Sequence, residues 1–211
     1  MENYVGKRLD GRYEIQDIIG VGGMAVVYKA YDSIDDRIVA IKVLKEEFLA
    51  KEEFRRRFKN ESKAIAILSH PNIVKVYDVS FGDLIQYIVM EYVDGRTLAQ
   101  FLAENPSKAM RERVFVQLLQ AVAYMHRCGV VHNDIKLDNV LVTRADNDVR
   151  LIDFGLADDD AASDIFVAFD GLAHRFLVVD VHSSLSFTIS AQTFSVALGR
   201  RIHSACSMMR L

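Results

Sequence analysis

One short polar segment of the chain contains most of its candidate catalytic groups. Residues 130–139 read VVHNDIKLDN, and Asp153 follows a further apolar run shortly afterwards. Mg²⁺ prefers hard oxygen ligands and takes only one or two carboxylates from a protein, so Asn139 and Asp153 are suited to hold it beside a phosphate. Asp134 is suited to accept a proton from a hydroxyl group, and Lys136 to neutralise charge on a transferring phosphoryl group. The segment therefore indicates a metal-phosphate site.

A lysine and a glutamate that interrupt apolar patterns form a second candidate group. In the run VAIKVL at residues 39–44, alternation places Lys42 on one face with Ala40, whose small side chain leaves space for a flat ring. Glu61 falls on the apolar stripe of a candidate helix, in the series Phe54, Phe58, Glu61, Ile65 and Leu68. A buried carboxylate needs a charged partner, and Lys42 is the natural candidate. The alternatives are a solvated strand lysine and a glutamate at the rim of the stripe.

A glycine-rich turn is the third candidate feature. Gly20, Gly22 and Gly23 lie in the run GVGGMAVV between two strand-like segments. Backbone at glycine approaches phosphate oxygens closely and presents N–H groups to them. A simple hairpin is the alternative reading. A dinucleotide-binding turn is disfavoured, because that motif needs a helix directly after the glycines and a strand-like run follows here.

The elements that must position these residues differ between the two halves of the chain. The first half is mostly strand-like, with one helix between residues 51 and 69 that His70-Pro71 ends. The predicted strands lie at residues 14–19, 25–30, 38–44, 74–79 and 87–92.

The second half is predicted to be mainly helical. A short helix at residues 98–103 precedes a long one, for which Ser107 is the expected N-cap and Gly129 the expected stop. The apolar stripe of the long helix consists of Val114, Leu118, Ala121, Val122 and Met125. Two apolar runs then form a predicted hairpin, residues 140–142 and 149–152, joined by a polar turn at 144–148.

The composition argues against several classes of function. The chain has 211 residues, is 51% hydrophobic and carries a formal net charge of -3, which gives no field that attracts nucleic acid. Its two cysteines, Cys128 and Cys206, lack the spacing of a zinc site or a disulfide framework. The N-terminus is too polar for a signal peptide, and no uncharged apolar run reaches the ~18 residues of a membrane helix. We expect a soluble, cytoplasmic chain; its oligomeric state is not indicated.

The order of these motifs resembles the protein-kinase signature set: a glycine-rich loop, Val-Ala-Ile-Lys, a helix glutamate, His-x-Asp-x-Lys-x-x-Asn and Asp-Phe-Gly. The first hundred residues are similar to the bacterial serine/threonine kinases that carry extracellular PASTA repeats. The segments that carry this similarity are LDGRY (9–13), GGM (22–24), HPNIV (70–74) and VMEYV (89–93). The resemblance covers roughly residues 9 to 158.

The resemblance implies an α+β, two-lobed, protein-kinase-like fold. Residues 1–93 would form a small antiparallel sheet lobe with one helix, and 94–160 part of a mainly helical lobe that looks incomplete. Residues 161–211 match nothing in the family pattern. The implied function is transfer of the ATP γ-phosphate, with Mg²⁺, to a serine or threonine of a protein substrate.

The resemblance also assigns roles to single residues. At the phosphate end, Gly20, Gly22 and Gly23 would cover the phosphates, Lys42 paired with Glu61 would hold the α- and β-phosphates, Asp134 would be the catalytic base, and Asn139 and Asp153 would bind Mg²⁺. Lys136 points to serine or threonine as the acceptor. At the adenine end, the ring would lie between Val27 and Ala40 above and Leu141 below, bonded to the backbone of Glu91 and Val93, with Met90 as gatekeeper.

The chain departs from the family pattern at several positions. Ala25 stands at the third glycine, and Asn133 replaces the arginine that normally pairs with a phosphorylated activation loop. No proline follows Asp153, so an Ala-Pro-Glu motif is absent, and the chain has no tryptophan. Two alternatives therefore stay open. One is an ATP-binding scaffold remnant that phosphorylates no peptide, and the other is a small-molecule kinase of the aminoglycoside or choline type, which Lys136 and the glycine-rich loop disfavour.

Overall fold

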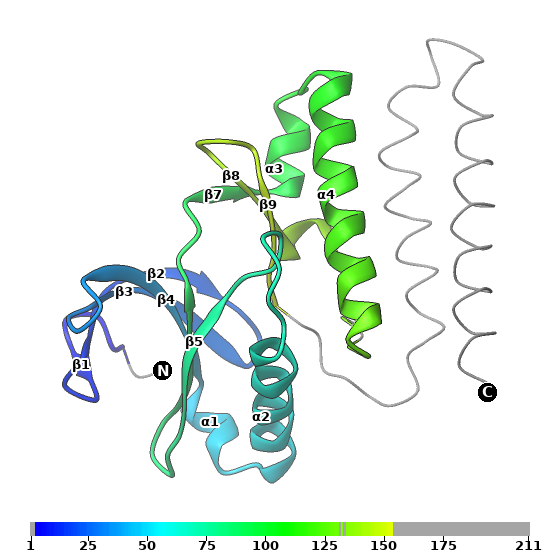
Figure 1. The fold of residues 1–211 in the computed structure, drawn as a ribbon. Helices are drawn as coiled ribbons and strands as arrows, with labels where there is room; N and C mark the ends of the chain where they lie inside the picture. The colour runs from blue at the N-terminus through cyan, green and yellow to red at the C-terminus, as the bar shows by residue number, and fades with distance from the viewer. Residues whose placement is uncertain (1–2, 131, 133, 154–211) are drawn as a thin grey trace, which may run out of the picture. The chain divides into compact units, whose positions relative to one another are not determined.

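The computed structural model describes residues 3–130, 132 and 134–153, all of which belong to one compact unit, residues 1–172 (Figure 1). The elements follow one another as β1 (Arg8–Leu9), β2 (Tyr13–Val21), β3 (Ala25–Asp32), β4 (Arg37–Leu44), α1 (Glu46–Leu49), α2 (Glu52–Ala66), β5 (Val76–Phe81), β6 (Gln86–Glu91), β7 (Gly95–Thr97), α3 (Leu98–Ala103), α4 (Lys108–Arg127), the 3₁₀ turn η1 (Leu137–Asn139), β8 (Val140–Thr143) and β9 (Val149–Leu151).

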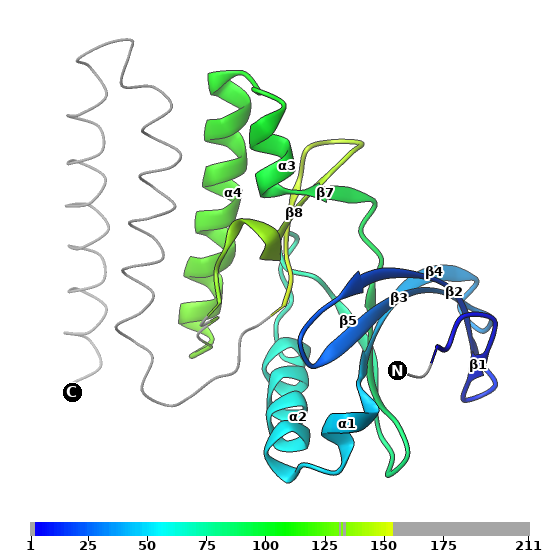
Figure 2. The same ribbon diagram turned by 180° about the vertical axis from the view of Figure 1, so that it is seen from behind.

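The first half of the chain forms a six-stranded antiparallel sheet with the order β1-β2-β3-β4-β6-β5 (Figures 1 and 2). Strand β4 lies between β3 and β6, so both of its edges are hydrogen-bonded. In this register Lys42 lies opposite Val27 on β3 and Ile88 on β6. The lysine is therefore fixed at the centre of the sheet.

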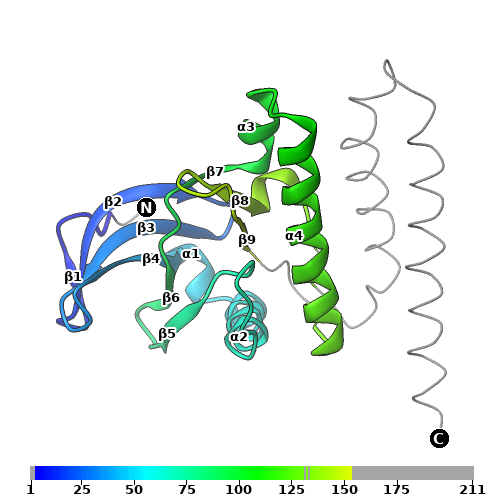
Figure 3. The same cartoon turned by 45° about the horizontal axis from the view of Figure 1, so that its top comes forward.

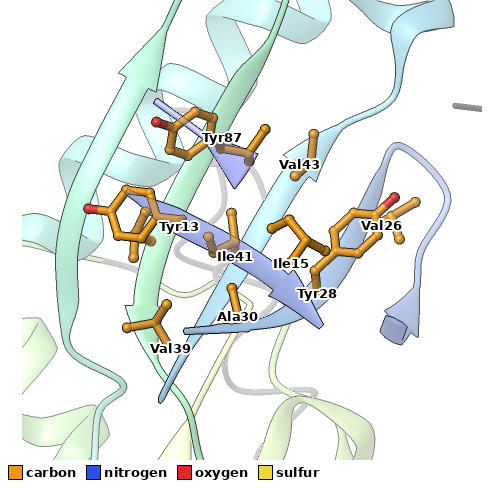
Figure 4. Close-up of a cluster of buried hydrophobic side chains, with 11 residues drawn as sticks. Tyr13, Ile15, Val26, Tyr28, Ala30, Val39, Ile41, Val43 and Tyr87 are labelled. Carbon is orange, nitrogen blue, oxygen red and sulfur yellow. The ribbon is translucent and has the colours of Figure 1, made fainter. Parts of the chain in front are cut away.

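One face of this sheet carries an apolar cluster, which Figure 4 shows as sticks. Its members alternate along the strands: Tyr13, Ile15, Val26, Tyr28, Ala30, Val39, Ile41, Val43, Tyr87 and Val89. Tyr13 and Tyr87 meet edge to face, with ring centroids 6.2 Å apart. Since successive side chains point to opposite faces of a strand, the odd-numbered residues of β4 enter this cluster, and Ala40 and Lys42 point to the other face.

Helix α2 covers the face to which Lys42 points. Its buried residues are Phe58, Glu61, Ser62 and Ile65, which includes the glutamate of the predicted apolar stripe. The helix ends at Ala66, and His70-Pro71 follows a short turn later. Figure 3 shows α2 nearly end-on beside β4, β5 and β6.

The second half contains two helices, α3 and α4, and the ends of α4 match the caps predicted for it. Ser107 accepts a hydrogen bond from the Met110 N–H at 3.3 Å, and Gly129 has a φ of 70°, the left-handed conformation that ends many helices. The buried stripe of α4 contains all five residues predicted for it: Val114, Leu118, Ala121, Val122 and Met125.

A small three-stranded antiparallel sheet, β7-β8-β9, lies between the two halves of the sequence. Gly95 on β7 is required by close packing, because a Cβ there would lie 2.7 Å from the Val142 carbonyl oxygen. Strand β9 also contacts the segment after α2: the Val74 N–H donates to the Leu151 carbonyl and the Leu151 N–H to the Asn72 carbonyl. This small sheet therefore links the first half of the chain to the loop that carries the candidate catalytic groups.

The α+β class is confirmed, as are the predicted strands, the two predicted helices of the second half and the hairpin. The expectation of a single helix in the first half was incomplete, because α1 adds one short turn of four residues. Strands β1 and β7 and the turn η1 were also not predicted, since two or three residues are too few to show a period. No helix in the described ranges has the length and hydrophobicity needed to cross a membrane. The segment 161–211 lies outside the described residues.

Candidate active site

Lys42 lies at the centre of the candidate site and contacts two carboxylates. Its Nζ is 2.6 Å from Glu61 Oε1 and 2.6 Å from Asp153 Oδ1. The side chains of Lys42 and Glu61 are only 9% and 2% exposed, while that of Asp153 is 43% exposed. Three separate elements therefore meet at one ammonium group: strand β4, helix α2 and the residue that follows β9.

The charges at this point stabilise the protonated lysine. Burial lowers the pKa of Lys42, but the carboxylates of Glu61 and Asp153 outweigh that effect, so the pKa lies above the ordinary lysine value. Glu61 Oε2 is buried and has no hydrogen-bond partner among the described residues. The ammonium group is thus charged and shared between the two carboxylates.

Asp153 adopts an uncommon backbone conformation. Its φ is 52°, in the left-handed region that costs free energy for residues other than glycine. Just before it, the Ile152 N–H donates to the Asn139 carbonyl at 2.9 Å, which fastens the end of β9 to the polar loop. Strain of this kind often occurs at functional sites, where the surrounding structure holds a side chain in place.

The polar loop holds the carboxylate of Asp134 from one side. Lys136 Nζ and Asn139 Nδ2 both donate to Asp134 Oδ2, each at 2.7 Å. Asn139 Nδ2 also lies 3.0 Å from the Asp134 carbonyl oxygen and 3.4 Å from that of Asp153. Asp134 Oδ1 has no hydrogen-bond partner among the described residues, so it is left to accept a proton.

His132 lies buried beneath the polar loop and contacts both Asp134 and Ile152. It is 1% exposed, and its Nε2 lies 3.1 Å from the Ile152 carbonyl oxygen. Because a carbonyl oxygen only accepts, Nε2 carries the hydrogen, and Nδ1 can then accept from the Asp134 N–H at 3.4 Å. Burial lowers the pKa of His132 to about 4, so the ring is neutral near pH 7. The buried ring thus has a structural role, connecting the loop at Asp134 to the end of β9.

Asn139 and Asp153 provide a donor set that fits Mg²⁺. With Nδ2 of Asn139 engaged as a donor, its Oδ1 has no partner in the described part of the chain, and neither does Asp153 Oδ2. One amide oxygen and one carboxylate, whose side chain is 43% exposed, form the kind of donor set that Mg²⁺ accepts. The described ranges contain no cluster of three or more His, Cys, Asp or Glu side chains that would suit another metal.

The residues expected around adenine come from both sheets. Val27 and Ala40 lie on the neighbouring strands β3 and β4, and Met90 pairs with Ala40 across β4 and β6. Leu141 lies on β8, opposite Thr97. The N–H of Val93, which follows β6, makes no hydrogen bond to any described residue. It is therefore available to a ligand.

The glycine-rich turn joins β2 to β3. The Gly22 N–H donates to the Ala25 carbonyl at 2.9 Å, and the Lys45 side chain donates to the Gly23 carbonyl at 2.7 Å. A Cβ at Gly23 would meet open space, and its φ is not in the left-handed region. The fold itself therefore does not require glycine at this position, which is consistent with close approach by an external group. Gly20 lies opposite Val27, at the end of the β2-β3 ladder.

Two features of the site were not predicted from the sequence. Lys45 anchors the glycine-rich turn, and Arg150 on β9 forms an ion pair with Glu91 at 3.0 Å. A single charge inside the apolar run VRLI was the only available signal for Arg150. Phe154 and Gly155 of the Asp-Phe-Gly motif, and Asn133, lie outside the described residues.

Comparisons with known proteins support one family. A family model described as Protein kinase domain matches residues 13–170, ten residues beyond the expected boundary at 160. The serine/threonine-protein kinase PrkC of Bacillus subtilis is 45% identical over 157 residues, which are 72% of this chain and 24% of the relative. The probable serine/threonine-protein kinase pknA2 of Bifidobacterium longum is 40% identical over 206 residues, 93% of this chain and 27% of the relative.

Solved structures show the same fold. The PknI kinase domain of Mycobacterium tuberculosis superposes with a TM-score of 0.62 at 32% identity, covering 72% of this chain and 63% of that one. This likeness confirms the two-lobed fold that the sequence predicted. The chain spans about a quarter of the length of the curated relatives that it matches.

Proposed function

Because the chain belongs to the protein kinase family, we propose that it transfers the γ-phosphate of ATP to a serine or threonine hydroxyl of a protein substrate. Members of this family generally use ATP and Mg²⁺. We propose the same pair here, in a site formed between a sheet lobe (1–93) and a helical lobe that begins at 94 and reaches at least 160. We also propose a cytoplasmic location, where ATP is abundant and exposed Cys128 stays a free thiol.

One observation carries this proposal: Lys42 Nζ lies 2.6 Å from both Glu61 and Asp153. A charged lysine fixed by a buried glutamate is held where it can bind phosphate oxygens. Oδ2 of Asp153, beside it, has no hydrogen-bond partner among the described residues. A triphosphate bound to Lys42 is therefore within reach of the proposed metal ligand.

Each residue then has a proposed part in binding or transfer. The binding residues are Gly20, Gly22 and Gly23 at the phosphates, Lys42 with Glu61 at the α- and β-phosphates, and Val27, Ala40, Leu141 and the backbone of Glu91 and Val93 at adenine. Asn139 and Asp153 would hold Mg²⁺, which when bound neutralises charge on the β- and γ-phosphates.

Asp134 and Lys136 would act on the acceptor and on the transferring group. Asp134 Oδ2 accepts hydrogen bonds from two donors, whereas Oδ1 has no partner among the described residues. Oδ1 would therefore accept the proton of the hydroxyl group. Lys136 is 53% exposed, which allows its ammonium group to move from Asp134 to the γ-phosphate. The protein thus contributes mainly position and charge to the transfer.

Transfer of radiolabel from [γ-³²P]ATP to a generic basic protein tests this function. We expect label on serine or threonine of the acceptor with the full chain and Mg²⁺, and a rate of labelling about 10²- to 10⁴-fold lower with Asp134→Asn. A thermal-shift assay in parallel separates an enzyme from a binder, since ATP at 100 times its Kd adds about 2.7 kcal/mol to the free energy of unfolding. A shift without any transfer would favour the scaffold alternative, and label on a small-molecule alcohol in place of protein would favour the small-molecule kinase.

A further inference from the structure

Arg150 is a feature of the site to which neither the sequence motifs nor the proposed function gives a role. Its Nε donates to Glu91 Oε1 at 3.0 Å. We propose that Arg150 is a positioning residue, which holds the adenine-binding backbone of Glu91–Val93 at a fixed distance from Asp153. This inference rests on the proposed function, because it assumes that adenine binds at Glu91 and phosphate at Asp153.

Glu91 is held by both of its carboxylate oxygens. Oε1 accepts from Arg150, and Oε2 lies 3.3 Å from the backbone N–H of Lys75. The backbone N–H of Glu91 in turn donates to the Lys75 carbonyl at 2.8 Å. The chain is therefore held in place at Glu91, the last residue of β6 and the first of the two residues whose backbone would bind adenine.

Arg150 lies close in the structure to a residue of the proposed adenine end of the site and close in sequence to a residue of the phosphate end. It is opposite Leu141 in the β8-β9 ladder, so both side chains project from the same face of the hairpin. Asp153 follows three residues later. Figure 3 shows β8 and β9 beside the segment that runs from β6 to β7. The Arg150 side chain thus connects strand β9, which pairs with the strand that carries Leu141, to the segment that would bind the edge of the adenine ring.

The burial of this pair distinguishes it from surface ion pairs nearby. The side chains of Arg150 and Glu91 are 21% and 26% exposed, and Arg150 Nη1 also donates to the Val149 carbonyl at 3.1 Å. By contrast, Arg144 and Asp94 approach to only 3.6 Å and are 62% and 76% exposed. Exposed ion pairs contribute little to stability, because water screens them. Partly buried charge-assisted hydrogen bonds are stronger and fix the relative positions of the two side chains.

Loss of the Arg150 guanidinium should therefore affect nucleotide binding more than the transfer step. In the described part of the chain, Asp134, Asn139 and Lys42 form no hydrogen bond or ion pair with Arg150, so its loss should leave the groups at the transferring phosphate in place. The segment at Glu91 would no longer be fixed relative to β9. Adenine and phosphate would then not reach their partners together, and part of the binding energy of ATP would be lost.

The test measures KM for ATP, kcat and the Kd of ATP with the full chain. Arg150→Met keeps the aliphatic stem and removes the charge. We expect KM and Kd to rise about tenfold, which is the effect of one partly buried charged hydrogen bond, and kcat to stay within about twofold. Arg150→Lys should recover part of the loss. Glu91→Gln should reproduce it, and the double variant Arg150→Met/Glu91→Gln should be no worse than either single variant.

Arg113→Gln is the matched control. Arg113 on α4 pairs at 2.9 Å with Asp148, which lies in the turn of the same hairpin, and forms no ion pair with Glu91 in the described part of the chain. Unchanged ATP affinity in Arg113→Gln together with the loss in Arg150→Met supports the inference. Equal Kd and KM in wild type and Arg150→Met, or additive losses in the double variant, would overturn it. If Arg150→Met does not fold, Arg150→Lys and Glu91→Gln decide the question. ATP binding without transfer in the wild type would contradict the proposed function alone.

Discussion

Two of the lysine-carboxylate pairs in the candidate site have almost the same distance but lie in different surroundings. Lys42 and Glu61 are 2.6 Å apart with side chains 9% and 2% exposed, whereas Lys136 and Asp134 are 2.7 Å apart with side chains 53% and 42% exposed. The attraction between two charges depends on the local dielectric as well as on distance, and water screens the second pair far more than the first. The buried pair therefore contributes more to the stability of the fold than the exposed pair does.

The buried pair belongs to the framework of the fold. Lys42 is on the central strand β4 and Glu61 on the face of α2 that packs on the sheet, so neither charge can leave without unpacking the first half of the chain. The exposed pair, Lys136 and Asp134, would act in the transfer reaction itself. Lys136 and Asp134 can exchange partners when a substrate arrives, because water already compensates both charges. Four predictions separate these two roles.

The largest expected effect is on transfer, at the exposed pair. Asp134→Asn removes the proton acceptor but keeps the shape of the side chain. The rate of phosphoryl transfer should fall about 10²- to 10⁴-fold, which is the usual contribution of general-base catalysis. Kd for ATP and the free energy of unfolding should stay near the wild-type values. The measurement is radiolabel transfer with titration calorimetry on the same preparations.

Asp138→Asn is the control for this prediction. Asp138 is an exposed carboxylate in the same loop, and the structure gives it no ion pair among the described residues. Its replacement should leave transfer unchanged. Equal losses in the two variants would mean that the rate responds to charge in the loop rather than to the base.

The next largest effect is on stability, at the buried pair. Lys42→Met leaves the carboxylate of Glu61 buried without its partner, which should lower the free energy of unfolding by about 3 kcal/mol. In Lys42→Met/Glu61→Leu no charge remains buried, and stability should return to within about 1 kcal/mol of wild type. Neither variant should transfer phosphate. Urea unfolding measures both, and a double variant less stable than Lys42→Met would contradict the framework role.

The loop that carries the exposed pair should respond to acid through His132. Its pKa is about 4 in the folded protein and about 6.5 in an unfolded chain, so the unfolded state binds more protons between these values. The free energy of unfolding should therefore fall as pH drops from 6.5 towards 4, by at most about 3 kcal/mol. His132→Gln should remove this contribution to the pH dependence of the free energy of unfolding. Since burial also lowers the pKa of His70 and His126, some slope should remain.

The smallest effect is on stability at the exposed pair. Lys136→Met should change the free energy of unfolding by less than about 0.5 kcal/mol, although its ion pair is nearly as short as that of Lys42. Urea unfolding beside Lys42→Met gives the comparison directly. Similar losses in the two variants would show that burial does not distinguish the pairs.

The buried framework was the more predictable part from sequence. The alternating pattern of β4 contains one charged residue, Lys42, and the apolar stripe of α2 contains one, Glu61. Because a buried charge needs an opposite charge beside it, these two patterns were enough to predict the pair. The groups of the loop were recognised by their motif, since their irregular backbone has no period. The positive φ of Asp153 and the two donors that hold Asp134 Oδ2 result from tertiary contacts, which no local pattern shows.

The missed features have a common physical cause. Arg150 and Lys45 act through partners 59 and 22 residues away in sequence, so their roles depend on how the strands are brought together. Strands β1 and β7 are edge or linking segments that form only because a longer strand pairs with them. In contrast, α4 was predicted with both caps, because its signals lie within the helix and its neighbouring residues.

Titration calorimetry of Mg-ATP tests the central claim most directly, namely that the ammonium of Lys42 and the oxygen ligands of Asn139 and Asp153 hold one nucleotide. The account predicts saturable binding of one ATP per chain that requires Mg²⁺, with the affinity reduced in Asp153→Asn and in Lys42→Met. Absence of saturable binding to the full chain, or binding that is indifferent to Mg²⁺ and to both substitutions, would contradict it.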